Sequence, residues 1–358
     1  MKNTCFRTPI TKPRIILADW PDERNDNRMN NKERILAVLD SQVVDRVPVG
    51  FWFHFLNADS QNQEFNAALE NPDLISKNIE GHRAYINAFK PDMVKIMSDG
   101  YFFMPKQEGW DIDSPADLGK IKPLAPDHPW IEGQVKLAAA VKPMQADTAY
   151  FYNVFSPTRS LHWILGDLMY LEFMTSAPQA MLEALEAITE TLLTLSRRVV
   201  RESGMDGIYF SVSNMNAKVI SDKLYSQYIK PAELHYLQEL EKLTPYNILH
   251  ICSNLGKKNN LDLYTDYPVK AVSWAAHLEN INLAGGKQKF PDKAVLGGFA
   301  HLPGSLIHIG SKEDIMAYTR KLLSETGRQG LILGADCTVP ADIPLEHLEW
   351  VREAAAEV

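Results

Sequence analysis

Cysteine is scarce in this sequence of 358 residues. Only Cys5, Cys252 and Cys337 occur, an odd number that is too small for a disulfide framework in a chain of this length. This excludes the disulfide-stapled secreted class and favours a reducing, cytoplasmic setting. The sequence also lacks a run near the ~18 apolar residues of a membrane span and a leader-like N-terminal segment. We therefore expect a soluble protein with no membrane partner.

Positive charge is the minority sign. The chain has 37 Lys and Arg against 45 Asp and Glu, a formal net charge of -8. Proteins that hold a phosphate backbone as their main activity carry a basic face, so we expect no nucleic-acid partner. The sequence contains no GxGxxG, no GxxxxGK[ST] and no GxSxG motif. Dinucleotide binding, nucleoside triphosphate binding and a serine nucleophile therefore have no support.

The domain organisation follows from where hydrophobic periodicity begins. Residues 1–29 are rich in charge, Asn and Pro without a sustained period, which predicts a flexible N-terminal arm. From Asn30 the sequence NNKERILAVLD has apolar residues at helical spacing behind an Asn cap, with Glu33 in the first turn. No repeat or linker follows. We expect residues 30–358 to form a single domain.

Short apolar runs rich in β-branched and aromatic residues alternate with helical patterns through the rest of the chain. Nearly continuous apolar strands separated by helices are typical of parallel sheets covered on both faces. Eight such runs predict an α/β fold, a (β/α)8 barrel; a doubly wound open sheet is the alternative. The predicted strands are residues 47–55, 92–99, 149–157, 207–214, 246–252, 271–276, 294–300 and 330–337.

Metal-ligand residue types lie at two of the predicted strand ends. His250 and Cys252 are two positions apart on one strand, so both side chains project from the same face. Cys337 follows the last strand, and active sites of such barrels lie at the carboxyl ends of the strands. A His, Cys, Cys set suits zinc with one open position. The alternative is that all three are buried core residues, which spacing alone leaves open.

Two further groups of residues are candidates at the strand ends. Asp99 is a candidate general acid or base, although the Asp-Gly sequence also fits a simple turn. Phe51 and Trp52 are candidates to line a pocket for a flat ligand, with an aromatic core as the alternative. The other polar residues near these ends are His54, Ser156, Asn214, His277 and His301.

These stretches together resemble the uroporphyrinogen decarboxylase superfamily from about Asn30 to the C-terminus. NKERILAVLDSQVVDRVPV is similar to the opening helix and the Asp-Arg-x-Pro entry to the first strand of that family. GLILGADCTVPADIPLEHLEWVREA is similar to its closing strand, loop and helix. The resemblance implies a (β/α)8 barrel, in agreement with the strand count.

Two branches of the superfamily differ at readable positions. Zinc-dependent methyltransferases that move methyl groups between a corrinoid protein and a thiol or related acceptor take their ligands from His-x-Cys and a later Cys, which match His250, Cys252 and Cys337. True decarboxylases of haem biosynthesis have a His in a Gly-His-Gly context where Cys337 stands. They also carry arginines after the first strand, where this chain has VGFWFHFLNADS. An octaanionic porphyrinogen would lack its counter-charges here.

The resemblance thus implies a zinc-dependent methyltransferase, with a corrinoid supplied by a partner protein and a small-molecule methyl donor or acceptor. Uroporphyrinogen decarboxylase is the alternative enzyme, because MSDGYFF matches the segment with the catalytic aspartate of that branch, and Asp99 is the corresponding residue. A non-catalytic corrinoid- or metal-binding protein is the third reading. On the zinc reading, His277 is a candidate partner of a ligand, and Phe51 and Trp52 are candidate cofactor contacts.

Overall fold

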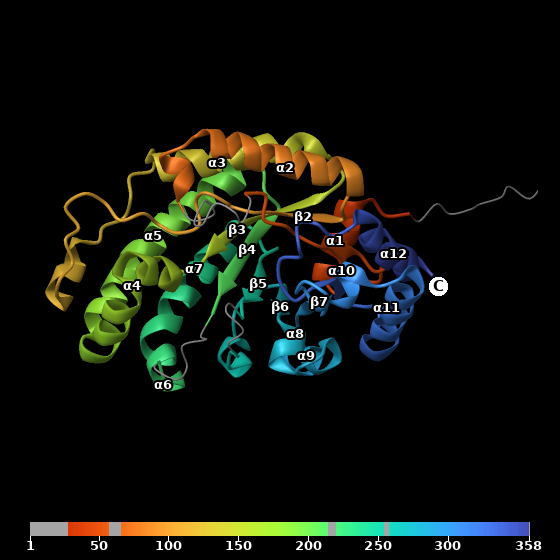
Figure 1. Ribbon diagram of the computed structural model, residues 1–358. Coiled ribbons are helices and arrows are strands. Elements are labelled where there is room, and N and C mark those ends of the chain that lie inside the picture. Colours follow the sequence, from red (N-terminus) through yellow and green to blue (C-terminus); the bar gives the residue numbers. More distant parts are fainter. Residues whose placement is uncertain (1–27, 57–65, 214–219, 254–257, 358) are drawn as a thin grey trace, which may run out of the picture.

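The computed structural model describes residues 28–56, 66–213, 220–253 and 258–357. Its strands are all parallel, in the order β1-β8-β7-β6-β5-β4-β3-β2, and helices surround them (Figure 1). The predicted (β/α)8 barrel is confirmed, and each predicted strand contains an observed one. The strands are β1 (Val49–Gly50), β2 (Met93–Ile96), β3 (Ala149–Phe155), β4 (Gly207–Val212), β5 (Ile248–Ile251), β6 (Ala271–Trp274), β7 (Ala294–Phe299) and β8 (Leu331–Ala335).

Helices connect successive strands across the outside of the barrel, as parallel pairing requires. No helix in the described residues is both long enough and apolar enough to cross a membrane. The α-helices are α1 (Asn31–Leu39), α2 (Asp73–Phe89), α3 (Pro129–Val141), α4 (Pro157–Ser176), α5 (Pro178–Ser203), α6 (Asp222–Leu224), α7 (Lys230–Glu241), α8 (Ala276–Glu279), α9 (Leu283–Lys289), α10 (Leu306–Ile309), α11 (Lys312–Thr326) and α12 (Leu345–Ala356).

A π-helical turn, η4 (Tyr225–Ile229), separates α6 from α7. Pro231 stands at the start of α7 and has no N–H to donate to a continuous ladder. A wider turn before the proline accommodates this missing donor.

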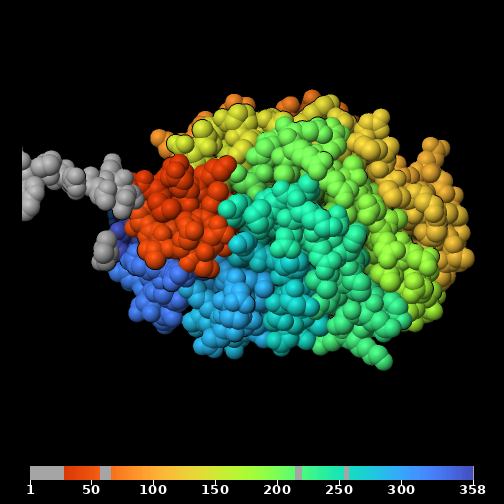
Figure 2. Space-filling view, turned by 180° about the vertical axis from the view of Figure 1, so that it is seen from behind, coloured from red at the N-terminus to blue at the C-terminus, as the bar shows by residue number. Residues whose placement is uncertain are grey.

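Helix α1 covers the amino-terminal end of the barrel. The Asn30 side chain accepts from the Glu33 N–H at 2.8 Å and Glu33 accepts from the Asn30 N–H at 2.9 Å, which confirms the predicted cap. Ile35 and Val38 are fully buried in one cluster with side chains from the first residues of several strands. Figure 2 shows this segment in red, lying against teal and blue segments from the second half of the chain. The barrel is therefore closed at this end.

The strands β1 and β2 meet at a seam, because they are the two ends of the pairing order and share no ladder. Two carboxylates bond across this seam. Asp92 Oδ2 accepts from the Val49 N–H at 2.9 Å at its amino-terminal end. Asp99 Oδ2 accepts from the N–H groups of Phe55 and Leu56 at 2.6 and 3.3 Å at its carboxyl end. Side chains thus bridge strands that lack mutual backbone bonds.

Helix α2 supplies further bonds to the seam. The Asn78 amide donates to the Met97 carbonyl at 3.0 Å, and the Tyr85 hydroxyl donates to the Phe51 carbonyl at 3.0 Å. His82 accepts from the Met97 N–H through Nε2 at 3.2 Å, while Nδ1 lies 2.9 Å from the Asn78 carbonyl and donates to it. This pattern requires a neutral imidazole, and burial lowers the pKa of His82 to about 4.

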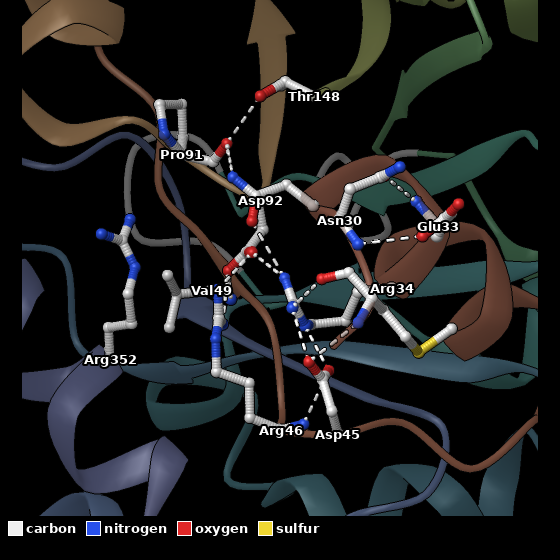
Figure 3. Close-up of polar contacts among 12 residues, drawn as sticks. Asn30, Glu33, Arg34, Asp45, Arg46, Val49, Pro91, Asp92, Thr148 and Arg352 are labelled. Carbon is white, nitrogen blue, oxygen red and sulfur yellow. Dashed lines mark hydrogen bonds and ion pairs between the residues drawn. The ribbon is translucent and has the colours of Figure 1, made fainter. Parts of the chain in front are cut away.

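A buried ion-pair network anchors the start of the seam (Figure 3). Asp92 is fully buried and lies 2.9 Å from Arg34 Nη1 and 2.6 Å from Arg46 Nη2. Arg34 also bonds Asp45 through Nε at 2.6 Å. The Asp-Arg-x-Pro segment noted in the sequence therefore has a structural role: its Asp and Arg fix α1 and the entry to β1 against Asp92.

Replacing Asp92 with Asn is expected to lower the free energy of unfolding by about 3–5 kcal/mol, because two arginines would lose their buried counter-charge. Urea unfolding followed by circular dichroism measures this change. The matched control is Glu80→Gln, which breaks the exposed ion pair with Arg83 and is expected to have little effect. Equal stability of the Asp92→Asn variant and the wild type would contradict the role given to the network.

The neutral state of His82 predicts a loss of stability in acid. The unfolded chain binds a proton at this ring below about pH 6.5, whereas the folded chain does so only near pH 4. The unfolded state therefore binds more protons between these values, and stability falls by about 1.4 kcal/mol per pH unit as the pH drops through this window. The variant His82→Gln, which does not titrate, should lack this component in urea unfolding at pH 6 and about pH 4.5. An identical pH dependence in both proteins would show that the ring is not the source.

Candidate metal centre and active site

A cavity of about 200 Å³ lies at the carboxyl ends of the strands. It is smaller than the roughly 300–1,000 Å³ of pockets for drug-sized ligands, so it suits a small molecule. Its lining combines a His and Cys group, an aromatic wall and two cationic side chains: His250, Cys252 and Cys337; Phe102, Phe103 and Phe155; Lys95 and Arg159.

The three residues predicted as metal ligands converge at this cavity. His250 lies in β5 and Cys252 follows it, while Cys337 lies in the loop after β8. One ligand atom from each side chain lies within 4.8 Å of the others. Cys337 Sγ is 3.7 Å from His250 Nε2. Within the described ranges this is the one group of three His, Cys, Asp or Glu side chains so arranged.

The donor set fits a tetrahedral zinc ion. With Zn–S near 2.3 Å and Zn–N near 2.0–2.1 Å, a tetrahedral angle places nitrogen and sulfur about 3.6 Å apart, close to the 3.7 Å between Cys337 and His250. Two sulfurs and one imidazole suit a borderline-soft ion. Three protein ligands would leave a fourth position of such an ion open, and all three residues line the cavity.

The loop after β8 brings Cys337 to β5 across two intervening strands, β6 and β7. Asp336, only 2% exposed, fixes the base of this loop through its N–H, which donates to the Phe299 carbonyl at 2.8 Å. Its Oδ2 accepts from the backbone N–H of His277 at 3.0 Å and lies 2.9 Å from His277 Nδ1. These bonds tie the loop to the start of α8 and direct the next residue inward.

Protonation in the group favours metal binding. Burial lowers the pKa of His250, so the ring is neutral at pH 7 and can present a lone pair. A hydrogen bond from the Cys252 thiol lowers the pKa of Cys337 well below its usual range, and the same bond raises that of Cys252. This favours the thiolate, the form that binds metal, at Cys337.

The second ring nitrogen of His250 has a partner, but it is not His277. His250 Nδ1 lies 3.2 Å from the Ser273 hydroxyl of β6. With Nδ1–H donated to Ser273, Nε2 is free as an acceptor on the side of Cys337. The Trp52 ring packs edge-on against the imidazole, with centroids 5.7 Å apart. His277 instead bonds Asp336, outside the cavity lining.

Asp99 does not line the cavity. Its carboxylate is fully buried and faces the loop after β1, where it accepts from two backbone N–H groups and contacts His54 Nδ1 at 2.8 Å. His54 lines the cavity, with Nε2 3.3 Å from the Thr338 hydroxyl. The sequence did not predict the contact between His54 and Asp99. It showed only that each is a polar residue near a strand end.

Two cavity cations were not singled out from the sequence. Lys95 projects from β2 into the barrel, 5% exposed, with Nζ 4.2 Å from the Tyr209 ring centroid. Arg159 lies in the first turn of α4, with its guanidinium 5.4 Å from the Phe103 ring centroid. Burial lowers the pKa of Lys95 to about 8 and also lowers that of Arg159. Lys95 could have been noticed in the sequence, because it is a charged residue within an otherwise apolar strand.

The aromatic candidates divide between core and cavity. Phe51 and Trp52 are 1% and 2% exposed and do not line the cavity. Phe51 packs on Phe299, and Trp52 packs on Tyr209 and His250. Ser156 is fully buried behind β3, and Asn214 lies outside the described residues.

Solved structures with the same fold include two enzymes of methyl transfer by name. A methyltransferase from Methanosarcina mazei matches with a TM-score of 0.67 and 16% identity, over 92% of this chain and 98% of that chain. A B12-independent methionine synthase from Shewanella sp. W3-18-1, in complex with selenomethionine, matches with a TM-score of 0.52 and 12% identity, over 87% of this chain and 97% of that chain. At these identities the likeness shows the fold.

The sequence gives the family more directly. No curated protein matches the chain. The family model described as uroporphyrinogen decarboxylase (URO-D) matches residues 112–358, which is more than half of the chain and includes all three candidate metal ligands. With the barrel and its strand-end site, this match shows that the chain belongs to the uroporphyrinogen decarboxylase family.

Proposed function

We propose that this protein is a zinc-dependent methyltransferase that moves a methyl group between a corrinoid, carried by a partner protein, and a small thiol-type acceptor. The observation that carries the proposal is the convergence of His250, Cys252 and Cys337 within 4.8 Å at a small cavity. The names of the two similar structures, a methyltransferase and a methionine synthase, support methyl transfer as the reaction class. The corrinoid partner rests on the family resemblance.

His250, Cys252 and Cys337 would hold a zinc ion at this site. Such an ion would supply a Lewis acid that lowers the pKa of a bound thiol. Phe102 and Phe155 give the cavity an apolar wall, against which the carbon chain of a small thiol could pack. Cys252 and Cys337 are free thiols in the structure, and a reducing, cytoplasmic setting would keep them so.

His54 is suited to accept the proton that an incoming thiol must lose. Its Nδ1 donates to Asp99, so Nε2 carries no proton; this nitrogen lies 3.3 Å from the hydroxyl of Thr338, which also lines the cavity. The S–H bond then breaks with its electron pair left on sulfur, and the proton forms a bond to Nε2. Asp99 stabilises the resulting imidazolium and fixes its orientation. We therefore assign Asp99 a positioning role and His54 the proton-accepting role.

Two observations disfavour uroporphyrinogen decarboxylation. The Asp99 carboxylate is turned toward the N–H groups of Phe55 and Leu56 instead of the cavity. A cavity of about 200 Å³ is also small for a tetrapyrrole with eight carboxylates. Conversion of uroporphyrinogen to coproporphyrinogen by the purified protein, abolished in Asp99→Asn, would reverse this assignment.

Metal content tests the centre directly. Wild-type protein purified under reducing conditions with zinc supplied is expected to hold about one zinc per chain, and Cys337→Ala is expected to lose it while the fold remains. Elemental analysis and circular dichroism measure the two properties. His235→Gln is the matched control, since this imidazole is exposed on α7, and it should retain zinc. Absence of zinc from the wild type would refute the proposal.

The proton-accepting role predicts that His54→Ala lowers kcat for methyl transfer from free methylcobalamin to 3-mercaptopropionate by about 10²–10³-fold. Zinc content and melting temperature should stay close to wild type. Added imidazole should restore part of the rate in this variant, which a purely structural role would not produce. A rate unchanged from wild type, or a loss that imidazole does not relieve, would count against His54.

A further inference from the structure

Glu233, on the buried face of α7, is an acidic side chain that the proposed reaction does not use. It is fully buried, and within the described ranges no Lys, Arg or His side chain forms an ion pair with it. The hydroxyls of Tyr225 and Tyr267 both donate to its Oε2, each at 2.6 Å. Burial of an ionised carboxylate without a counter-charge is unfavourable, so burial favours the protonated form of such a group.

The second carboxyl oxygen of Glu233, Oε1, has no hydrogen-bond partner in the part of the chain that the structure describes. The same is true of two buried hydroxyls, those of Ser156, which precedes α4, and Thr158 in its first turn. Burial raises the pKa of Glu233, whereas donation from the two tyrosines and then from these two hydroxyls lowers it. The hydroxyls are therefore close to the carboxyl group without completing a hydrogen bond to it. Because nearly all buried polar atoms are partnered, we expect a small rotation of these groups to close the missing bonds.

The other titratable groups around Glu233 do not compete for its proton. Tyr170 of α4 and Tyr264 of η6 (Leu261–Tyr264) are fully buried, and burial and then the charge of Glu233 raise the pKa of both, so these phenols stay protonated. Burial lowers the pKa of Arg159, and the groups that oppose this are Cys252, Tyr170 and Asp167. The charged side chains of α4, α5 and α7 and of the segment before β6 form other pairs: His162 with Asp167, Arg197 with Glu239, His235 with Glu190 and Lys230 with Asp266.

We infer that Glu233 is a proton switch that sets the direction of hydrogen bonding at the start of α4. With a proton on the carboxyl group, Oε1–H donates to the hydroxyl oxygen of Ser156 or Thr158. When the O–H bond breaks and the proton passes to water, its electron pair stays on Oε1, which then accepts from the same hydroxyls. Tyr225 and Tyr267 donate to Oε2 in both states. This inference does not rest on the proposed function.

The switch lies next to the cavity along the chain. Thr158 is followed by Arg159, whose side chain lines the cavity. A reversal of the bonds in the first turn of α4 therefore takes place one residue from a cavity side chain. Since burial raises the pKa of Glu233 to about 7, the reversal falls in the neutral range of pH.

Infrared difference spectra between the wild type and Glu233→Gln, recorded from about pH 6 to 9, test the inference directly. The difference is expected to contain the C=O stretch of one protonated carboxyl group, lost in a single step near pH 7. Near-ultraviolet circular dichroism, which is sensitive to the two bonded tyrosines, should change with the same midpoint in the wild type alone. A carboxyl band that is absent at about pH 6, or that persists to about pH 9, would overturn the inference.

Stability gives a second test with a defined sign. The unfolded chain releases the Glu233 proton near pH 4.3, and the folded chain releases it near pH 7, so the folded state binds more protons between these values. As the pH rises through this window, the folding equilibrium constant of the wild type relative to Glu233→Gln should fall by up to about tenfold per pH unit. Urea unfolding measures this ratio, and His82 titrates in both proteins and cancels. Glu190→Gln, at an exposed carboxylate of α5, is the matched control and should follow the wild type. A ratio that does not vary with pH would contradict the switch.

Two further variants test the hydroxyl partners and leave Glu233 in place, so they decide the matter even if Glu233→Gln does not fold. Thr158→Val keeps the branched shape of the side chain without its hydroxyl, and Ser156→Ala removes the other hydroxyl. Loss of a donor to the ionised carboxylate raises the pKa of Glu233, so the infrared step of at least one variant should move to higher pH than in the wild type. A step at the wild-type pH in both variants would refute the bonds assigned to these hydroxyls.

Discussion

The structure depends on how the barrel closes between β1 and β2. These strands share no ladder, so the backbone groups that face the seam must bond to side chains or remain unsatisfied. Asp92 meets this need at the amino-terminal end, and Asp99 meets it at the carboxyl end. Asn78 and His82 of α2 bond the Met97 backbone between them. A single displaced carboxylate would leave buried N–H groups unpaired and open the barrel at one edge.

This closure also sets the geometry of the cavity. The carboxylate that bonds the Phe55 and Leu56 N–H groups is the same carboxylate that holds His54. Asp99 therefore has a structural requirement that is independent of any chemistry, and its presence alone does not indicate decarboxylation. The imidazole receives a fixed orientation as a consequence of barrel closure. The Asp99 carboxylate therefore serves both the closure of the barrel and the orientation of His54.

The strands were predictable because strands covered on both faces are nearly continuously apolar. Active sites of such barrels lie at the carboxyl ends of the strands, and this placed Cys252 and Cys337 at the same end of the barrel. The sequence did not show in which direction the other side chains of the cavity point. Lys95 was read as part of an apolar strand, since its inward direction depends on register around a closed barrel. The bond between Asp336 and His277, which directs Cys337 inward, joins residues fifty-nine positions apart, and no local pattern encodes it.

Side chains from three separate parts of the barrel line the cavity. The sulfur and imidazole side chains come from the end of β5 and the loop after β8, His54 from the loop after β1, and the cations from β2 and α4. The charge of Lys95 lowers the pKa of Cys337 and, together with that of Arg159, opposes the rise in the pKa of Cys252. Aromatic rings contact Lys95 and Arg159, and both side chains line the cavity. One cavity therefore joins a cluster of metal-type side chains to two cations that come from other strands of the same barrel.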